Sequence, residues 1–226
     1  MAQGRVDPRP ARPAGHLVSG PLSGLILPPG GGRTLTGPAQ HVTFKITGER
    51  STVGSLFEVV VPVGFDVGAH RHTRTEEFFY VLDGEVDMFA FEPEVRTAGG
   101  WQNWRSADGE TVHRGTPGAL IHIPPGCPHG FANPGPNPAR MLFQAAPPPD
   151  HERYFEELFE LLADGAPPPG AVEELRRRWD VEQFTPLKPG QPLPTEPLGT
   201  DPLGTDPAGV GSTGAGSTGA GPTGAG

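Results

Sequence analysis

Two stretches decide the fold and contain most of the polar residues that point to chemistry: GFDVGAHRHTRTEEFFYVLDG at positions 64–84 and GALIHIPPGCPHGFAN at positions 118–133. In the first stretch a single residue separates His70 from His72. Residues two apart on an extended strand point to the same side, so both imidazoles can reach one metal ion. The Thr-Arg-Thr that follows allows the chain to turn. A glutamate at the head of the next apolar run can then lie beside the two histidines.

The second stretch supplies a third imidazole. Pro124, Pro125 and Gly126 form a sequence that makes a tight corner, and His129 begins the run that follows. Three imidazoles and one carboxylate are a hard-to-borderline donor set, which suits divalent Fe, Mn, Ni, Co, Cu or Zn. The sequence therefore predicts one divalent transition metal ion and does not specify which element it is.

Short β-rich runs surround both stretches. They are bounded by Gly, Pro, Asn or Asp and lie at 41–47, 55–62, 77–84, 85–92, 119–124 and 139–145. Many short strands without intervening helices indicate an all-β protein, built as an antiparallel sandwich or barrel. Asp83-Gly84 is a dipeptide favoured in hairpin turns. We therefore expect the strands on its two sides to be neighbours.

After the prolines at 147–149 the apolar period becomes helical. The pattern predicts one helix over 151–165, capped by Asp150, and a second over 171–180. We expect both helices to pack on the outside of the barrel or across a subunit boundary. They are assigned a structural role and no chemistry.

Glycine and proline mark the domain boundaries, because the 34 glycines and 30 prolines are concentrated at the two ends of the chain. The composition predicts a disordered N-terminal arm at 1–15, a barrel at 16–147, the C-terminal helices at 148–185 and a disordered tail at 186–226. The tail repeats PLGTD and GSTGA and contains little that can be buried. Neither end is expected to carry chemistry.

The charge argues against several classes of partner. The formal net charge is −9, and Lys45 and Lys188 are the two lysines of the sequence, so we expect no nucleic-acid partner. No apolar run is long enough to cross a bilayer, and the first residues lack the apolar stretch of a signal peptide. Cys127 is the single cysteine. We expect a soluble cytoplasmic protein without a membrane partner.

The two stretches resemble the paired motifs of the cupin superfamily, G(X)5HXH(X)3-4E(X)6G and G(X)5PXG(X)2H(X)3N. The defining residues all stand at the family spacing: Gly64, His70, His72, Glu77, Gly84, Gly118, Pro124, Gly126, His129 and Asn133. The resemblance implies a double-stranded β-helix, or jelly-roll, barrel with a C-terminal helical appendix. It also implies a metal held by His70, His72, Glu77 and His129. The spacing to Gly84 selects Glu77 over Glu76, which should face outward.

The chain is similar in particular to small, single-domain quercetin dioxygenase-like cupins. This likeness implies that a flavonol or related enol binds the metal as its anion, that Glu77 is the catalytic base, and that O2 cleaves the ring. The expected apolar lining favours an aromatic or other apolar small molecule. The alternatives are a metal-dependent polyketide cyclase or isomerase, which needs no oxygen, and a non-catalytic small-molecule-binding protein. A homodimer is expected.

Several other residues have two interpretations. His122 is either a base beside the cavity or, as we expect, a strand histidine satisfied by its neighbours. Trp101 and Trp104, in a loop inserted between the motifs, either pack that loop or wall the cavity mouth. Cys127 is expected to pack rather than to ligate. The remaining histidines are expected at the surface: His16, His41, His113 and His151. Sugar-phosphate isomerases need lysines and arginines in the cavity, and Lys45 of the barrel should point outward.

Overall fold

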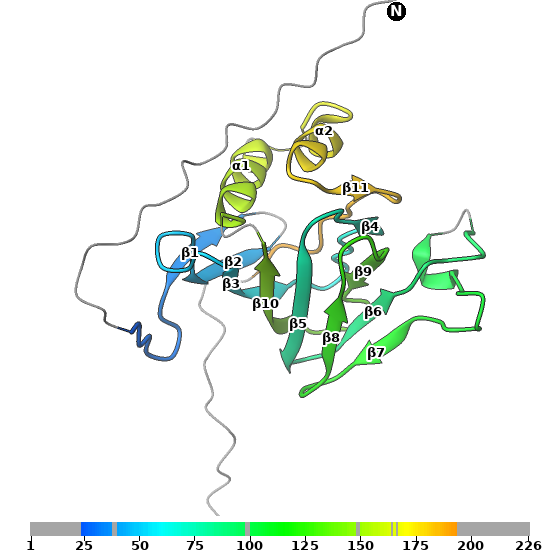
Figure 1. The fold of residues 1–226 in the computed structure, drawn as a ribbon, viewed down its shortest axis with the longest axis horizontal. Helices are drawn as coiled ribbons and strands as arrows, with labels where there is room; N and C mark the ends of the chain where they lie inside the picture. Colours follow the sequence, from blue (N-terminus) through cyan, green and yellow to red (C-terminus); the bar gives the residue numbers. More distant parts are fainter. Residues whose placement is uncertain are drawn as a thin grey trace, which may run out of the picture. The chain divides into compact units, whose positions relative to one another are not determined.

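The computed structural model describes residues 24–37, 40–97, 100–147, 150–163, 165 and 167–193 (Figure 1). The predicted arm at 1–15, His16 and both repeats of the predicted tail lie outside the described residues. Among the described residues, no helix is long and apolar enough to span a membrane.

The described strands form two antiparallel sheets (Figure 1). The six-stranded sheet has the order β1 (Arg33–Thr36), β2 (His41–Ile46), β3 (Ser55–Val61), β10 (Ala139–Ala146), β5 (Glu76–Asp83) and β8 (Leu120–Ile123). The five-stranded sheet has the order β11 (Glu182–Gln183), β4 (His70–Arg71), β9 (His129–Ala132), β6 (Val86–Ala90) and β7 (His113–Gly115). The predicted all-β class is confirmed.

The core lies between the two sheets and follows from strand alternation. Phe57 of β3, Phe79 of β5 and Phe143 of β10 are buried, and their neighbours along each strand are more exposed. The ring of Phe143 stacks on Phe57 at 5.5 Å and on Phe79 at 4.7 Å between centroids. Each buried side chain of this size contributes roughly 1.5–3 kcal/mol to folding.

The turn at Asp83-Gly84 corrects one prediction. We expected a hairpin between the strands on its two sides, but β5 pairs with β10 and β8, while β6 pairs with β7 and β9. Both edges of β5 are thus occupied, so the chain crosses to the other sheet. Gly84 has φ 71°, and a Cβ there would lie 2.8 Å from the Cα of Ala139. A larger residue at this position is therefore strained.

The chain after the second helix also differs from the expectation of disorder from residue 186. Glu182 and Gln183 pair with β4 as strand β11. Further along, Lys188 and Asp66 exchange backbone hydrogen bonds at 3.0 and 2.8 Å, and the Gln191 amide donates to the Val63 carbonyl. The segment from Lys188 to Gln191 thus lies along the barrel, because its backbone groups form hydrogen bonds there.

Two helices, α1 (Glu152–Ala163) and α2 (Ala171–Arg178), lie at the same end of the barrel (Figure 1). The Glu152 carboxylate fixes the start of α1, because it accepts hydrogen bonds from the Gly48 amide and the Ser55 hydroxyl at 3.0 and 2.8 Å. The helices cover the end of the barrel rather than the outer face of a sheet (Figure 1), and the alternative placement across a subunit boundary stays a prediction. The apolar face of α1 and Arg176 of α2 line a cavity at this end of the barrel.

The inserted loop contains a short 3-10 helix, Trp101–Asn103. Trp101 and Trp104 are buried against Phe89 in an apolar cluster separate from the main core. The Trp101 indole donates to the Asp66 carboxylate at 2.8 Å. Of the two interpretations offered by the sequence, the structure supports loop packing, since neither tryptophan lines the cavity under the helices.

Candidate metal centre

Four polar side chains meet inside the barrel. His70 lies on β4, His72 follows that strand, Glu77 is the second residue of β5, and His129 begins β9. Their exposed fractions are 4%, 3%, 2% and 1%. One donor atom from each lies within 4.8 Å of the others. The Glu77 carboxylate oxygens lie 3.0 Å from the Nε2 atoms of His72 and His129. These are the four residues that the sequence singled out.

The Pro-Pro-Gly corner positions His129. The Cys127 amide donates to the Pro124 carbonyl at 3.1 Å, and Gly126 has φ 85°, which is the geometry of a turn that places glycine third. The Gly126 amide donates to the His72 carbonyl at 2.6 Å. The corner is therefore joined directly to the chain that carries His72. On β9 His129 pairs across the sheet with His70.

Backbone carbonyls orient all three rings. The Nδ1 atom of His70 lies 2.8 Å from the Gly68 oxygen, that of His72 3.1 Å from the Asp180 oxygen, and that of His129 3.0 Å from the Cys127 oxygen. A carbonyl oxygen can only accept, so each Nδ1 carries a hydrogen. In a neutral ring the lone pair is then on Nε2. Such backbone contacts to the second nitrogen are the usual support of metal-binding histidines.

The cluster fits a divalent cation. With neutral rings, the Nε2 atoms of His72 and His129 and the Oε2 atom of Glu77 are buried and have no hydrogen-bond donor in the described protein. Acceptor atoms then face one another at 3.0 Å, and only a cation or an added proton can satisfy them. Three imidazole nitrogens and a carboxylate suit a transition metal ion.

The charges in the cluster support the same conclusion. Burial lowers the pKa of His70 well below its usual range, and the nearby cationic groups lower it further. Burial opposes protonation of His72 as well, but the charge and hydrogen bond of Glu77 outweigh it and raise the pKa of His72. Burial also favours a neutral Glu77, but His72 and His129 hold the pKa of Glu77 well below its usual range. Glu77 is thus anionic, and a proton on His72 would have to leave if an ion were to bind.

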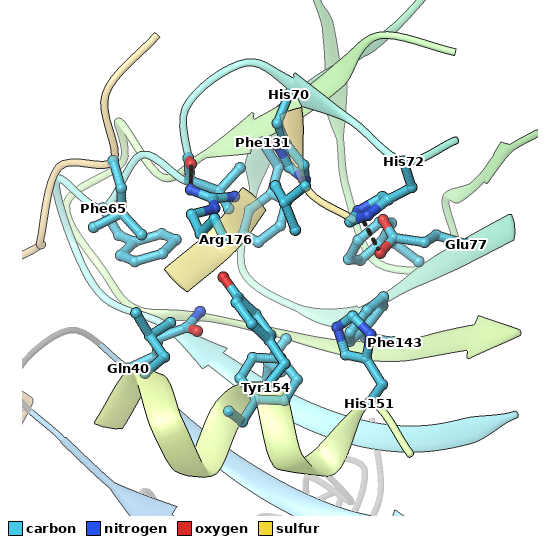
Figure 2. Close-up of a pocket in the computed structure, with 17 residues that line it drawn as sticks. Gln40, Phe65, His70, His72, Glu77, Phe131, Phe143, His151, Tyr154 and Arg176 are labelled. Carbon is cyan, nitrogen blue, oxygen red and sulfur yellow. Dashed lines mark hydrogen bonds and ion pairs between the residues drawn. The ribbon is translucent and has the colours of Figure 1, made fainter. Parts of the chain in front are cut away.

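A cavity adjoins the cluster (Figure 2). It has about 50 Å³ of free space and is mostly apolar, with phenylalanines from both sheets in its wall. Its polar lining residues outside the cluster are Gln40, His151, Tyr154 and Arg176. Three of these come from the segment of the two helices that the sequence analysis assigned no chemistry.

His151 and Arg176 are two cavity residues that could not be assigned to the site from the motifs. His151, expected at the surface, is 6% exposed, and its ring centre lies 6.4 Å from that of His72. Arg176 is 1% exposed. A signal was available in each helix. The four positions 151, 154, 155 and 158 follow the spacing of one helix face, as do 172, 175, 176 and 179, and the other members are apolar or aromatic.

The other residues considered at the sequence level lie outside the cavity. Glu76 and His122 face outward and lie 3.5 Å apart, and the His122 ring stacks on Phe78. Lys45 forms an ion pair with Glu58 at 2.9 Å. Cys127 is half-buried and packs against the core.

Two antiparallel sheets that enclose a cluster of three histidines and a glutamate are the arrangement implied by the paired motifs. The family model of the cupins, described as "Cupin", matches residues 29–164. This match covers more than half of the sequence, and the chain belongs to the cupin family. The predicted double-stranded β-helix fold with its helical appendix is thereby confirmed.

Individual relatives are more distant. An uncharacterized protein of Methanocaldococcus jannaschii is 32% identical over 102 residues, which are 43% of this chain and 64% of that protein. KdgF from Halomonas sp. has a similar structure, with 16% identity, a TM-score of 0.44 and coverage of 57% of this chain and 99% of that one. The DMSP lyase DddQ from Ruegeria pomeroyi has 19% identity, a TM-score of 0.37 and coverage of 49% and 48%. The chain thus spans less than two thirds of the first and third of these proteins.

Proposed function

We propose that this cupin is a metal-dependent enzyme that acts on a small organic molecule in the cavity beside the cluster. The observation that carries the proposal is that four donor side chains converge on one centre, and that three of them, His70, His72 and Glu77, also line a cavity. A structural metal site is enclosed by its ligands, whereas a catalytic site leaves a position open to substrate. His70, His72 and His129 would hold the ion through Nε2, and Glu77 through its carboxylate. Such an ion would acidify a bound hydroxyl or enol and polarise a carbonyl.

Glu77 is the residue we propose as the catalytic base. It is anionic, because its pKa is held low, and its Oε2 atom faces the shared centre without a hydrogen-bond donor when the rings are neutral. A carboxylate that is weakly held by the ion could detach and accept the proton of a substrate hydroxyl bound beside the centre. Phe79 and Phe143 line the same cavity and make its wall apolar. Proton transfer would therefore take place in an apolar environment.

For the reaction we propose oxidative cleavage of an enol by O2, as the resemblance to quercetin dioxygenase-like cupins implies. The size of the cavity favours a small enol over a flavonol. About 50 Å³ of free space is well below the roughly 300–1,000 Å³ of pockets that enclose drug-sized ligands. A flavonol would require α1 and α2 to move away from the barrel, whereas a small diketone requires only local adjustment.

A second candidate is a reaction without oxygen, catalysed by a cyclase or an isomerase of the cupin type. Arg176 favours it, because an isomerase that works through an anion needs a basic residue in the cavity. The structure places one there. A buried guanidinium can stabilise the anion formed when a base removes a proton.

Elemental analysis and an oxygen electrode test the proposal together. We expect purified protein to contain about one divalent transition metal ion per chain, and to consume O2 with 2,4-pentanedione, a small enolisable diketone. Glu77→Gln should abolish uptake, and His113→Ala, a change on an exposed edge strand, should not. Anaerobic turnover would replace the dioxygenase by the second candidate. Protein that neither contains nor takes up a metal ion would be a non-catalytic binding protein.

The homodimer and the cytoplasmic location remain predictions from the sequence. Analytical ultracentrifugation of the full chain would test the first.

A further inference from the structure

We propose that the substrate carries a carboxylate, which pairs with Arg176 while the rest of the molecule reaches the histidines and Glu77. This inference rests on the proposed function, because it names the substrate class of the same site. It begins from one side chain on α2 that the metal centre does not use.

Arg176 is a buried cation with an incomplete set of partners. Arg176 is 1% exposed to solvent. One terminal nitrogen donates to the Val67 carbonyl at 2.9 Å, and the Nε atom has no hydrogen-bond partner. A guanidinium does not lose its proton in proteins. A permanent charge is thus buried with donors to spare, which is costly unless an anion arrives.

The carboxylate in the same cavity is already engaged. Glu77 is the single acidic residue in the described lining, and it contacts His72 and His129 at 3.0 Å. An arginine at the surface, by contrast, has an acidic partner. Arg71 pairs with Glu182 at 2.7 Å at the surface. The buried arginine is therefore the one that a ligand would have to neutralise.

Three polar groups face the cavity away from the histidine cluster (Figure 2). Arg176 comes from α2, Tyr154 from α1, and Gln40 from the residue before β2. In Figure 2 the Tyr154 hydroxyl points toward Arg176. Burial raises the pKa of Tyr154, against a smaller effect of the Arg176 charge, so the hydroxyl keeps its proton and can donate. A guanidinium and a phenol directed at one place form a receptor for an oxyanion.

Charge and size favour a carboxylate over a phosphate. One guanidinium matches one planar, singly charged group, whereas a phosphate carries up to two charges and three exposed oxygens. The rest of the lining is apolar, with Phe65, Phe131 and Leu158 in the wall, which suits a short hydrocarbon portion. A divalent ion beside Glu77 and Arg176 would also leave the cavity with net positive charge. A substrate anion reduces that charge.

The test compares an acid with its neutral amide. Propionate and propionamide have nearly the same shape and differ in charge, and calorimetry measures the binding of each. Chelator-treated protein is used first, because a carboxylate could also bind directly to a metal ion. We expect propionate to bind at least about tenfold more tightly than propionamide, the difference typical of a hydrogen-bonded charge pair. Equal binding would overturn the proposal, as would tighter binding of inorganic phosphate.

Variants assign the effect to the side chain. Arg176→Met keeps the length and loses the charge, and it should reduce propionate binding about 10- to 100-fold. Arg176→Lys keeps the charge without the planar fork and should retain part of the affinity. Arg177→Met is the matched control, because Arg177 is exposed on the same helix and pairs with Glu174. Unchanged propionate binding by Arg176→Met would refute the assignment. The comparison of acid with amide in the unsubstituted protein needs no variant to fold.

A further readout separates ligand binding from a structural role. If Arg176 served only to hold α2 through Val67, its replacement by Met should lower the melting temperature. A buried charge that waits for a ligand predicts an unchanged or higher melting temperature for Arg176→Met. Failure of the proposed function would look different. A protein that binds propionate but takes up no divalent ion would retain the arginine site and refute the metal-dependent enzyme. A protein that takes up the ion but binds propionate and propionamide equally would refute the arginine site and leave the metal-dependent enzyme standing.

Discussion

Replacement of His129 by alanine should remove most of the thermal stabilisation that a bound metal ion gives the protein. His129 supplies one of four donor atoms that lie within 4.8 Å of one another. Its Nε2 atom is 3.0 Å from Glu77, and its Nδ1 atom is fixed by the Cys127 carbonyl. Alanine provides no donor, and no other side chain in the cluster can take its place without leaving the backbone contact that orients it.

The expected magnitude follows from linkage. Loss of a group that merely orients a ligand costs about 10- to 100-fold in metal affinity, so loss of the ligand itself should cost at least about 100-fold. At a free metal concentration about 100 times the wild-type Kd, the ion stabilises the wild-type protein by about 2.7 kcal/mol. The variant at the same concentration gains about 0.4 kcal/mol. For a protein of this size these values correspond to melting-temperature shifts of about 5–11 °C and about 1–2 °C.

The assay is the difference between thermal unfolding with and without the metal ion found in the purified wild-type protein. Each variant serves as its own reference, so any damage done by the substitution itself cancels. His122→Ala is the control, because His122 faces outward from β8 and stacks on Phe78. It should retain the full wild-type shift. If His129→Ala showed the same metal-induced shift in melting temperature and the same metal content as the wild-type protein, His129 would not be a ligand.

Two further predictions concern stability. Asp66→Ala should lower the free energy of unfolding by roughly 2–4 kcal/mol, because the buried carboxylate accepts hydrogen bonds from four donors in the barrel, the inserted loop and the C-terminal segment. Urea unfolding measures this loss, and Glu110→Ala, a change at an exposed residue, is the control. Equal free energies of unfolding for the two variants would contradict the structural role of Asp66. Gly84→Ala should cost about 1–3 kcal/mol and more than Gly109→Ala, since both have positive φ but only Gly84 would place a Cβ 2.8 Å from Ala139. Equal melting temperatures for these two variants would argue against that contact.

The sequence predicts the elements whose signals are local. Alternation within a strand decides which residues face the core, so Phe79 and Phe143 could be placed inside from the sequence. The turn at Gly126 depends on two prolines and a glycine that stand together, and it carries His129 to the start of β9. Motif spacing then relates the two stretches. The meeting of the four side chains was therefore predictable, although their binding of a metal remains a proposal.

Strand pairing was harder to predict, because it depends on competition between segments far apart in the chain. Asp83-Gly84 favours a hairpin on local grounds. Nevertheless β5 pairs with β10 and β8, which lie well beyond it in the sequence. A turn sequence shows that the chain changes direction. It does not show whether the next strand joins the same sheet or crosses to the other one.

The C-terminal segment contributes to the site through contacts that no local pattern contains. Asp180 follows α2, and its carbonyl accepts the hydrogen bond that orients His72, 108 residues earlier. Its carboxylate accepts hydrogen bonds from the amides of Thr73 and Arg74. The next residues form β11, which pairs with the strand of His70. The segment that places Arg176 in the cavity thus also orients two of the proposed ligands. Arg176 on an otherwise apolar helix face indicated burial, but the sequence alone does not show that its side chain enters the cavity beside the histidine cluster.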